Sequence, residues 1–187
     1  SDIASSPYKT AIQTMAARGI IAGYSDGTFR PDKLVMRKHF AKMIVGVMGL
    51  PVTEADWQDA RSPFIDCGKD NPTDLYPHDY VAAAALSGLA LGVGNSMYAP
   101  WAAISRAQAV TMVVRGAQQY APEVLETPPQ GYDCPVPGTG DQTHDTNMVV
   151  AECSGLLVGI EGLGSGWNPW SQATRAEVAQ ILWNVMR

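Results

Sequence analysis

The sequence lacks the features that mark a membrane, disulfide-rich or metal-binding protein. No apolar run approaches about 18 residues, so we expect no membrane insertion. Three cysteines in 187 residues do not specify a disulfide framework, because one bridge plus a free thiol and three thiols both fit. No Cys-X-X-Cys or histidine-rich spacing occurs. The sequence therefore predicts no metal ion and no other cofactor.

Catalytic patterns are absent as well. No paired-carboxylate, Ser/His or Cys/His arrangement recurs at a useful spacing, so we expect no enzyme, and any catalysis would lie in a fused domain. No signal peptide is visible. Because the sequence starts at Ser1 and stops at Arg187 inside an apparent helix, we expect an excised fragment of a larger protein.

Charge is scarce and uneven. Charged residues make up 17% of the chain and hydrophobic residues 46%, which is typical of a globular protein. Net charge is −5, yet residues 1–50 carry seven Lys/Arg against three acids, and residues 51–187 carry six against fifteen. The overall sign argues against nucleic acid as a partner. The basic first third could receive an anion, or could be an ordinary solvated face.

Three copies of one unit fill the chain. The segment GYSDGTFRPDKLVMRKHFAKMI (23–44) aligns without a gap with GVGNSMYAPWAAISRAQAVTMV (92–113), an offset of 69 residues, and WNPWSQATRAEVAQIL (167–182) follows at the same offset. Upstream, the same short segment occurs three times, as RGIIAG, SGLALG and SGLLVG. We therefore predict repeats at 1–60, 61–120 and 121–187, joined by Pro-rich connections into one cooperative domain.

Each unit reads as helix, glycine turn, extended loop, helix. Apolar residues at helical spacing, Ile12, Met15 and Ala16, mark the first helix of the first copy, and a glycine stands where its left-handed end is expected (Gly19, Gly88 and Gly155 in the three copies). The second helix carries an i, i+3, i+4, i+7 apolar stripe, which is Phe40, Met43, Ile44 and Val47 in the first copy. Two short helices cannot bury this stripe alone, so the units must pack on one another in an all-α fold.

The start of the second helix carries a capping box and an arginine. Thr174 and Glu177 form the box in the third copy and Ser105 and Gln108 form it in the second, whereas the first copy lacks it. The arginine stands at the same place in every copy (Arg37, Arg106 and Arg175), although a cation is slightly unfavourable in a first helical turn.

Two explanations of the arginine are open. It could pair with an acid such as Asp66 or Asp133, or pack its stem over an aromatic ring. Alternatively, an arginine beside a helix N-terminus could make a carboxylate or phosphate site.

The repeated glycine turn, DGTFRP and TRAE motifs resemble the S-layer homology, or SLH, repeat, and PFID (63–66) resembles its start. The resemblance spans nearly the whole chain as three tandem copies. It implies a pseudo-threefold, three-pronged domain that tethers secreted proteins to the bacterial cell wall or S-layer. It also implies that grooves between repeats bind a wall polysaccharide bearing a pyruvate ketal on an amino sugar, with possible self-assembly through a parent S-layer protein.

The resemblance implies ligand contacts from the motif arginine, the turn and the loop tryptophans. We expect them from Arg37, Arg106, Arg175, Gly23, Asp26, Gly27, Gly92, Asn95, Ser96, Trp101, Gly159 and Trp170. An arginine can grip a ketal carboxylate through two hydrogen bonds, and turn glycines let a sugar approach the backbone. Trp101 and Trp170 could instead cap the core between prongs, where we also expect Phe29, Tyr98 and Trp167.

No copy keeps both halves of the motif. The first has VMRKH in place of ITRAE, the second has Asn95-Ser96 in place of Asp-Gly, and the third has Gly-Ser-Gly in its turn. We therefore expect unequal grooves, of which one or two bind, with those of the basic first copy favoured. Cys67 and Cys134 stand at equivalent positions, and a bridge between them or between Cys134 and Cys153 is open.

Other functions remain open. The degenerate turns would also suit a protein–protein or lattice interaction module that has lost its sugar sites. A third reading keeps the anchoring role with a different envelope ligand, such as modified peptidoglycan.

Overall fold

The structure is a computed structural model that describes residues 2–53, 63–68 and 73–187. In these ranges it is helical, with no β-strand, which confirms the all-α prediction. The helices are α1 (Lys9–Ala17), α2 (Arg37–Val47), α3 (His78–Leu86), α4 (Arg106–Tyr120), the 3-10 turn η1 (Pro122–Val124), α5 (Gln142–Cys153) and α6 (Arg175–Val185). None of these helices is long and apolar enough to cross a membrane.

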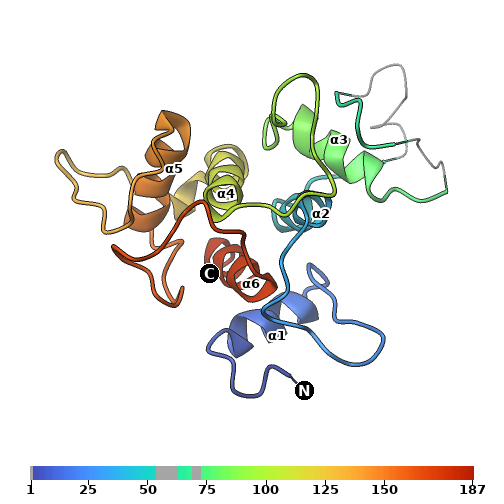
Figure 1. Ribbon diagram of the computed structural model, residues 1–187, viewed down its shortest axis with the longest axis horizontal. Coiled ribbons are helices and arrows are strands. Elements are labelled where there is room, and N and C mark those ends of the chain that lie inside the picture. Colours follow the sequence, from blue (N-terminus) through green and yellow to red (C-terminus); the bar gives the residue numbers. More distant parts are fainter. Residues whose placement is uncertain (1, 54–62, 69–72) are drawn as a thin grey trace.

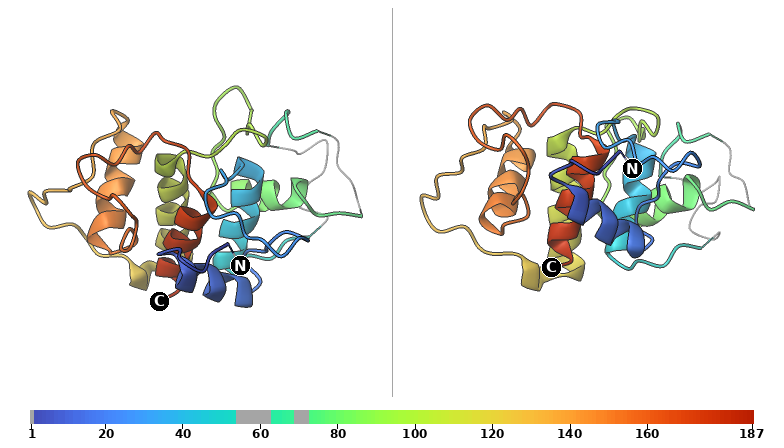
Figure 2. Two further views of the ribbon diagram at one scale, coloured as in Figure 1. Left: turned by 60° about the horizontal axis from the view of Figure 1, so that its bottom comes forward. Right: turned by 90° about the horizontal axis from the view of Figure 1, so that it is seen from below.

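The second helices of the three repeats form the centre of the molecule. Helices α2, α4 and α6 lie side by side, and α1, α3 and α5 stand outside them as three prongs (Figures 1 and 2). Each outer helix packs on the central helix of the preceding repeat: α3 on α2, α5 on α4, and α1 on α6. Every prong is therefore built from two repeats, and the pairing of α1 with α6 closes the three repeats into a ring.

A cycle of backbone hydrogen bonds marks the pseudo-threefold axis. The amide of Val35 donates to the carbonyl of Ala173 (3.1 Å), Ala173 donates to Ile104 (2.9 Å), and Ile104 donates back to Val35 (2.8 Å). These three residues occupy equivalent positions in the three repeats, 69 residues apart. The sequence register therefore coincides with the spatial symmetry.

The N-termini of the central helices are capped by loops of neighbouring repeats. The amides of Arg37 and Lys38 donate to the carbonyls of Ala102 (2.9 Å) and Pro100 (3.2 Å), and the equivalent pairs recur in the other two repeats. Such bonds satisfy two donors that a helix start leaves free. They explain how α2 begins at Arg37 without a side-chain cap.

The predicted core is largely confirmed. The stripe of α2 is buried at Phe40, Met43 and Ile44. Phe29, Tyr98 and Trp167 are core residues, with 6%, 0% and 3% exposure. The glycines that end the outer helices, Gly19, Gly88 and Gly155, have φ of 71°, 69° and 71°, as a left-handed helix end requires.

One detail of the core differs from the prediction. Ala16 is exposed, and Ala11 joins Ile12 and Met15 in the core, because α1 turns a slightly different face to α6.

All three cysteines are free thiols. Cys67 is buried, and its burial, followed by the nearby Asp66 carboxylate, raises the pKa of its thiol to about 12. The predicted boundary at residues 60 and 61 lies outside the described ranges.

Candidate functional site

Each motif arginine reaches into the next repeat and stacks on its loop aromatic. The guanidinium carbon lies 4.7 Å from the ring centroid of Tyr98 for Arg37, 4.9 Å from that of Trp167 for Arg106, and 4.3 Å from that of Phe29 for Arg175. The stacking explanation is thus confirmed for all three. Because the arginines lie where two repeats meet, each also borders a groove between repeats.

The expectation that helix N-terminal amides hold an anion is wrong for the first two amides of each central helix. In α6, the amides of Arg175 and Ala176 are bonded to the carbonyls of Lys33 (2.9 Å) and Pro31 (3.0 Å). The third amide, that of Glu177, donates to Thr174 Oγ1 in the predicted capping box. The groups that line the grooves are therefore side chains and turn carbonyls, and not these helix amides.

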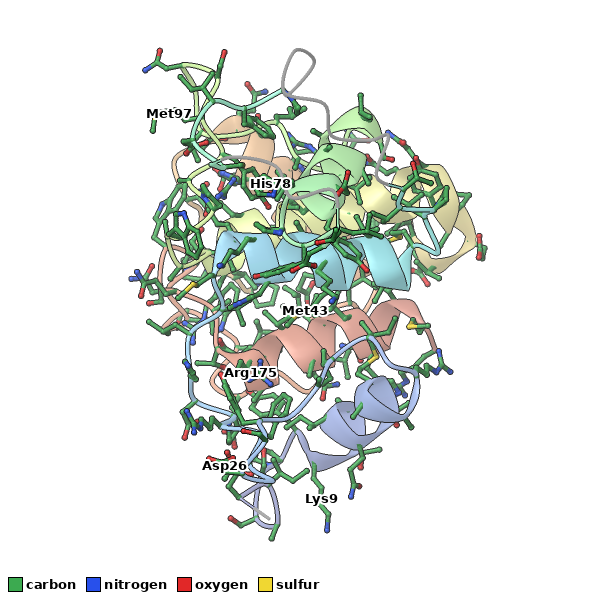
Figure 3. The ribbon with its side chains drawn as sticks, turned by 90° about the vertical axis from the view of Figure 1, so that its right-hand side faces the viewer. Lys9, Asp26, Met43, His78, Met97 and Arg175 are labelled. Carbon is green, nitrogen blue, oxygen red and sulfur yellow. The ribbon has the colours of Figure 1, made fainter. Side chains whose placement is uncertain are left out.

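Groove 1 is the hollow beside Arg175. We use this name for the hollow lined by the turn at 19–24, by His39, Lys42 and Met43 of α2, and by Lys33 and Arg175; its volume is about 370 Å³. Arg175 lies between Met43 and the turn that carries Asp26 (Figure 3). Its guanidinium NH2 donates to the carbonyl of Ala22 (2.7 Å) and its Nε to that of Phe29 (2.9 Å).

Groove 1 is electropositive. Lys33, Lys42 and Arg175 line it, and no aspartate or glutamate occurs among the described residues of its wall. Burial, and after it the charges of Lys38 and Arg175, lower the pKa of His39 below its usual value, so His39 is a neutral imidazole at neutral pH. The groove therefore offers unbalanced positive charge beside the apolar side chains of the turn.

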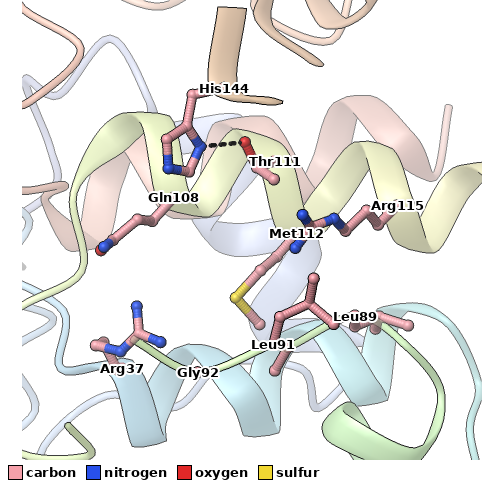
Figure 4. A pocket seen from close by; sticks show the side chains of 10 residues that line it. Arg37, Leu89, Leu91, Gly92, Gln108, Thr111, Met112, Arg115 and His144 are labelled. Atoms are coloured by element: carbon pink, nitrogen blue, oxygen red, sulfur yellow. Dashed lines mark hydrogen bonds between the residues drawn. The ribbon is translucent and has the colours of Figure 1, made fainter. Parts of the chain in front are cut away.

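Groove 2 is the pseudo-equivalent hollow one repeat on. Leu89 to Gly92 of the second turn line it with Gln108, Thr111, Met112 and Arg115 of α4, with Arg37, and with His144 of α5; its volume is about 70 Å³. His144 Nδ1 lies 2.6 Å from Thr111 Oγ1. The Arg37 guanidinium points from the opposite side of the groove toward the wall that carries Gln108 and His144 (Figure 4).

Side chains of the third repeat fill the third groove. Glu177 Oε1 accepts hydrogen bonds from Arg106 Nε (3.0 Å) and NH2 (2.5 Å), which neutralises the motif arginine. Gln180 and Asn184 occupy the adjoining space and donate to the carbonyl of Val158 at 3.2 Å and 2.9 Å. A Cβ built on Gly159 would meet Gln180 Nε2 at 3.1 Å, so the turn is packed against this filling.

The predicted turn residues divide between wall and scaffold. Gly23 and Gly92 line grooves 1 and 2, and a Cβ on Gly92 would approach the carbonyl oxygen of Met97 to 2.5 Å. Asp26 instead organises its own turn, accepting from the amide of Thr28 (2.9 Å) and pairing with Arg30 (2.8 Å). The remaining predicted turn residues lie outside the groove walls at positive φ: Gly27 (79°), Asn95 (51°) and Ser96 (55°).

Both tryptophans after the loop proline lie at the surface. Trp101 is 61% exposed, with the Lys38 ammonium 3.2 Å from its ring centroid. Trp170 is 46% exposed, and its Nε1 donates to the carbonyl of Thr139 (2.9 Å). Neither caps the core between prongs, and neither is part of the wall of groove 1 or groove 2.

Asp66 organises the loop of the second repeat. Its carboxylate accepts from the amides of Tyr98 (2.8 Å) and Ala99 (2.7 Å), and Asp2 does the same for Phe29 and Arg30. The alternative of an ion pair between a motif arginine and Asp66 is not what forms. Arg106 pairs with Glu177 of its neighbouring repeat instead.

Sequence reasoning missed several residues that give the grooves their character. Lys33, His39 and Lys42 line groove 1, and Arg115 and His144 line groove 2. The third position of each central helix was a usable signal, because it is His39, Gln108 and Glu177 in the three copies. His144 gave no such signal, because it reaches groove 2 from the outer helix of the next repeat.

The comparisons with known proteins agree with this architecture. A family model for the S-layer homology domain matches residues 1–41 and 73–110. An S-layer protein of Bacillus licheniformis is 28% identical over 172 residues, which is 92% of this chain and 18% of that protein. A surface layer protein of Brevibacillus choshinensis is 31% identical over 113 residues, 60% of this chain and 10% of that protein.

One relative carries an enzyme's name. An uncharacterized cell wall amidase of Bacillus anthracis is 26% identical over 163 residues, 86% of this chain and 27% of that protein. The chain thus spans about a quarter or less of the length of these relatives, which share a cell-surface or cell-wall location. The chain therefore carries S-layer homology repeats at residues 1–41 and 73–110, and its third repeat shares their register and symmetry.

Proposed function

We propose that the chain is a non-covalent anchoring module of the bacterial cell surface, and that groove 1 binds an anionic, pyruvylated amino sugar of a cell-wall polysaccharide. The observation that carries the proposal is the unbalanced positive charge of groove 1, which Lys33, Lys42 and Arg175 supply without a carboxylate in its described wall. A ketal carboxylate supplies the missing negative charge.

The shape of groove 1 also suits a sugar. Its volume of about 370 Å³ lies at the lower end of the roughly 300–1,000 Å³ typical of small-molecule pockets. Ile20, Ile21 and Met43 give it an apolar side, and Tyr24 adds an aromatic ring beside the cations. Such a wall can pack against the carbon face of a sugar while the cations receive its carboxylate.

The decisive experiment is a calorimetric titration with a pyruvylated mannosamine glycoside, compared with the same sugar without the ketal. We expect saturable binding of the pyruvylated sugar alone. His39→Glu places a carboxylate at the position that Glu177 holds in the third repeat, and it should abolish this binding while circular dichroism shows an intact fold. Equal binding of both sugars, or of neither, would refute the proposal, and binding of peptidoglycan instead would transfer the anchoring role to that ligand.

A second function is favoured by a separate observation. Exposed apolar side chains surround the turn of the second repeat: Ile65 (78% exposed), Leu91 (68%), Val93 (48%) and Met97 (40%). Clustered exposed apolar residues mark interaction surfaces. A lattice or protein-interaction role predicts concentration-dependent association in sedimentation experiments, which Leu91→Ser with Met97→Ser should remove.

A further inference from the structure

Groove 2 differs from groove 1 in size and in the source of its charge. Its volume of about 70 Å³ is far below the roughly 300 Å³ at which small-molecule pockets begin. Two arginines from different repeats line it, Arg37 and Arg115, together with His144 from a third element. A compact group fits this hollow, whereas a sugar ring belongs to the larger groove 1.

Arg37 is a buried cation that has no carboxylate partner among the described residues. Its residue is 4% exposed, and its Nε donates to the carbonyl of Tyr98 (2.7 Å). No hydrogen bond from its two terminal nitrogens is formed within the described residues, and these nitrogens face the groove (Figure 4). The Asp66 carboxylate is occupied by two loop amides. A buried charge without an opposite charge beside it is costly, so an anion in the groove would offset that cost.

Arg115 repeats this situation on the other wall. It is half-buried, and within the described residues it forms no ion pair. Its repeat position is Gly46 in the first copy and Asn184 in the third, so the second cation is particular to groove 2. Burial lowers the pKa of the Arg115 guanidinium, and it does the same for Arg37, where the nearby Tyr98 and Asp66 offset the desolvation only in part.

His144 supplies a third polar group from α5. Its Nδ1 is engaged by Thr111 Oγ1 at 2.6 Å. When the Thr111 hydroxyl donates to Nδ1, the ring proton resides on Nε2, the nitrogen that is left to donate to a ligand. Two guanidinium groups and one imidazole present more donors than the two oxygens of a carboxylate require, and they match the three or four oxygens of a phosphate.

We propose that groove 2 is a second, independent binding site, and that its ligand is a phosphate group, either free or as a substituent of an envelope polymer. The site does not depend on sugar binding in groove 1. Arg37, Arg115 and His144 hold the phosphate oxygens, and Gln108 borders the site at the position where Glu177 closes the third groove.

The test is calorimetric titration of the intact chain with inorganic phosphate, with a sugar phosphate monoester and with acetate, in a buffer free of other oxyanions. We expect one phosphate site per chain, with acetate binding much more weakly. Arg115→Gln should weaken phosphate binding at least about tenfold, the effect of losing one charge-assisted hydrogen bond, whereas Arg115→Lys should retain most of it.

Two further variants separate this site from groove 1. Gln108→Glu should install opposite Arg37 the carboxylate that neutralises Arg106 and abolish phosphate binding with the fold intact, whereas Lys42→Gln in groove 1 should leave it unchanged. A sugar phosphate that binds tighter than inorganic phosphate identifies a polymer substituent, and equal affinities identify the free ion. The proposal is overturned if no phosphate binds, if acetate competes equally, or if Lys42→Gln and not Gln108→Glu removes binding.

Discussion

Glu177→Gln tests whether the ion pair with Arg106 holds the third groove closed. Gln108 has the same repeat position in the second copy and forms a complete capping box: its Oε1 accepts from the amide of Ser105 (3.1 Å), and its own amide donates to Ser105 Oγ (3.2 Å). A glutamine at position 177 can therefore keep the cap of α6. This glutamine cannot supply the negative charge that faces Arg106.

The expected magnitude follows from the two bonds that the charge supports. Hydrogen bonds to charged groups contribute about 1.5–3 kcal/mol. The Glu177 side chain is 6% exposed and that of Arg106 20%, so solvent weakens the pair only in part. Because a glutamine oxygen can retain one weaker bond, we expect the free energy of unfolding to fall by about 2 kcal/mol. For a chain of this size that lowers the melting temperature by about 4–8 °C.

A double-mutant cycle with Arg106→Gln provides the assay. Thermal unfolding followed by circular dichroism should give a coupling energy between the two positions of about 1–2 kcal/mol. Titration of the Glu177→Gln variant with the groove 1 ligand should give unchanged affinity, because Arg175 and the first turn are untouched. Additive effects of the two substitutions, within about 0.5 kcal/mol, would show that the pair contributes nothing and that Gln180 and Asn184 alone fill the groove.

Three further outcomes follow from the geometry. Lys42→Gln should weaken the groove 1 ligand about two- to fivefold in calorimetry without changing the melting temperature, since a partly solvated cation contributes about 0.4–1 kcal/mol. Because the folded state disfavours protonated His39, the free energy of unfolding should fall as pH drops below about 6.5. His39→Gln should lessen this loss of stability in thermal melts compared at pH 7.5 and 5.5. Identical pH profiles of the two proteins would contradict the lowered pKa of His39. Gly92→Ala places a Cβ against the carbonyl of Met97, whereas the Cβ of Gly27→Ala meets open space at a similar left-handed φ. In chemical denaturation, Gly92→Ala should therefore lower the free energy of unfolding by at least about 1 kcal/mol more than Gly27→Ala. Equal losses would show that the strain lies in the backbone conformation alone.

The repeat register could be predicted from the sequence because it is a property of local chemistry. Glycines at helix ends, an apolar stripe and capping residues each leave a mark at a constant spacing, and all of them recur. The pairing of outer with central helices left no such mark. The apolar face of α1 indicates that it must be buried, but does not indicate whether α2 or α6 covers it, and the structure pairs it with α6.

The candidate site could be predicted only in part for the same reason. The motif arginines were identifiable, but each one's role depends on the residue that faces it from the next repeat. Arg106 meets Glu177 and is neutralised, whereas Arg37 meets Gln108 and keeps its charge. Such differences arise at distances of about 70 positions in the chain, where one sequence without its fold gives no pairing information.

The contact between α1 and α6 has a consequence for the evolution of such a chain. An open stack of repeats has two ends, so copies can be gained or lost there and the remainder still folds. A ring has no end copy: deletion of one repeat would strip a helix from two prongs at once, and an added fourth would find no vacant face. Duplication is therefore closed to this architecture as a source of new binding sites. What remains free to diverge is the chemistry of each groove, and the three grooves of this chain have already diverged.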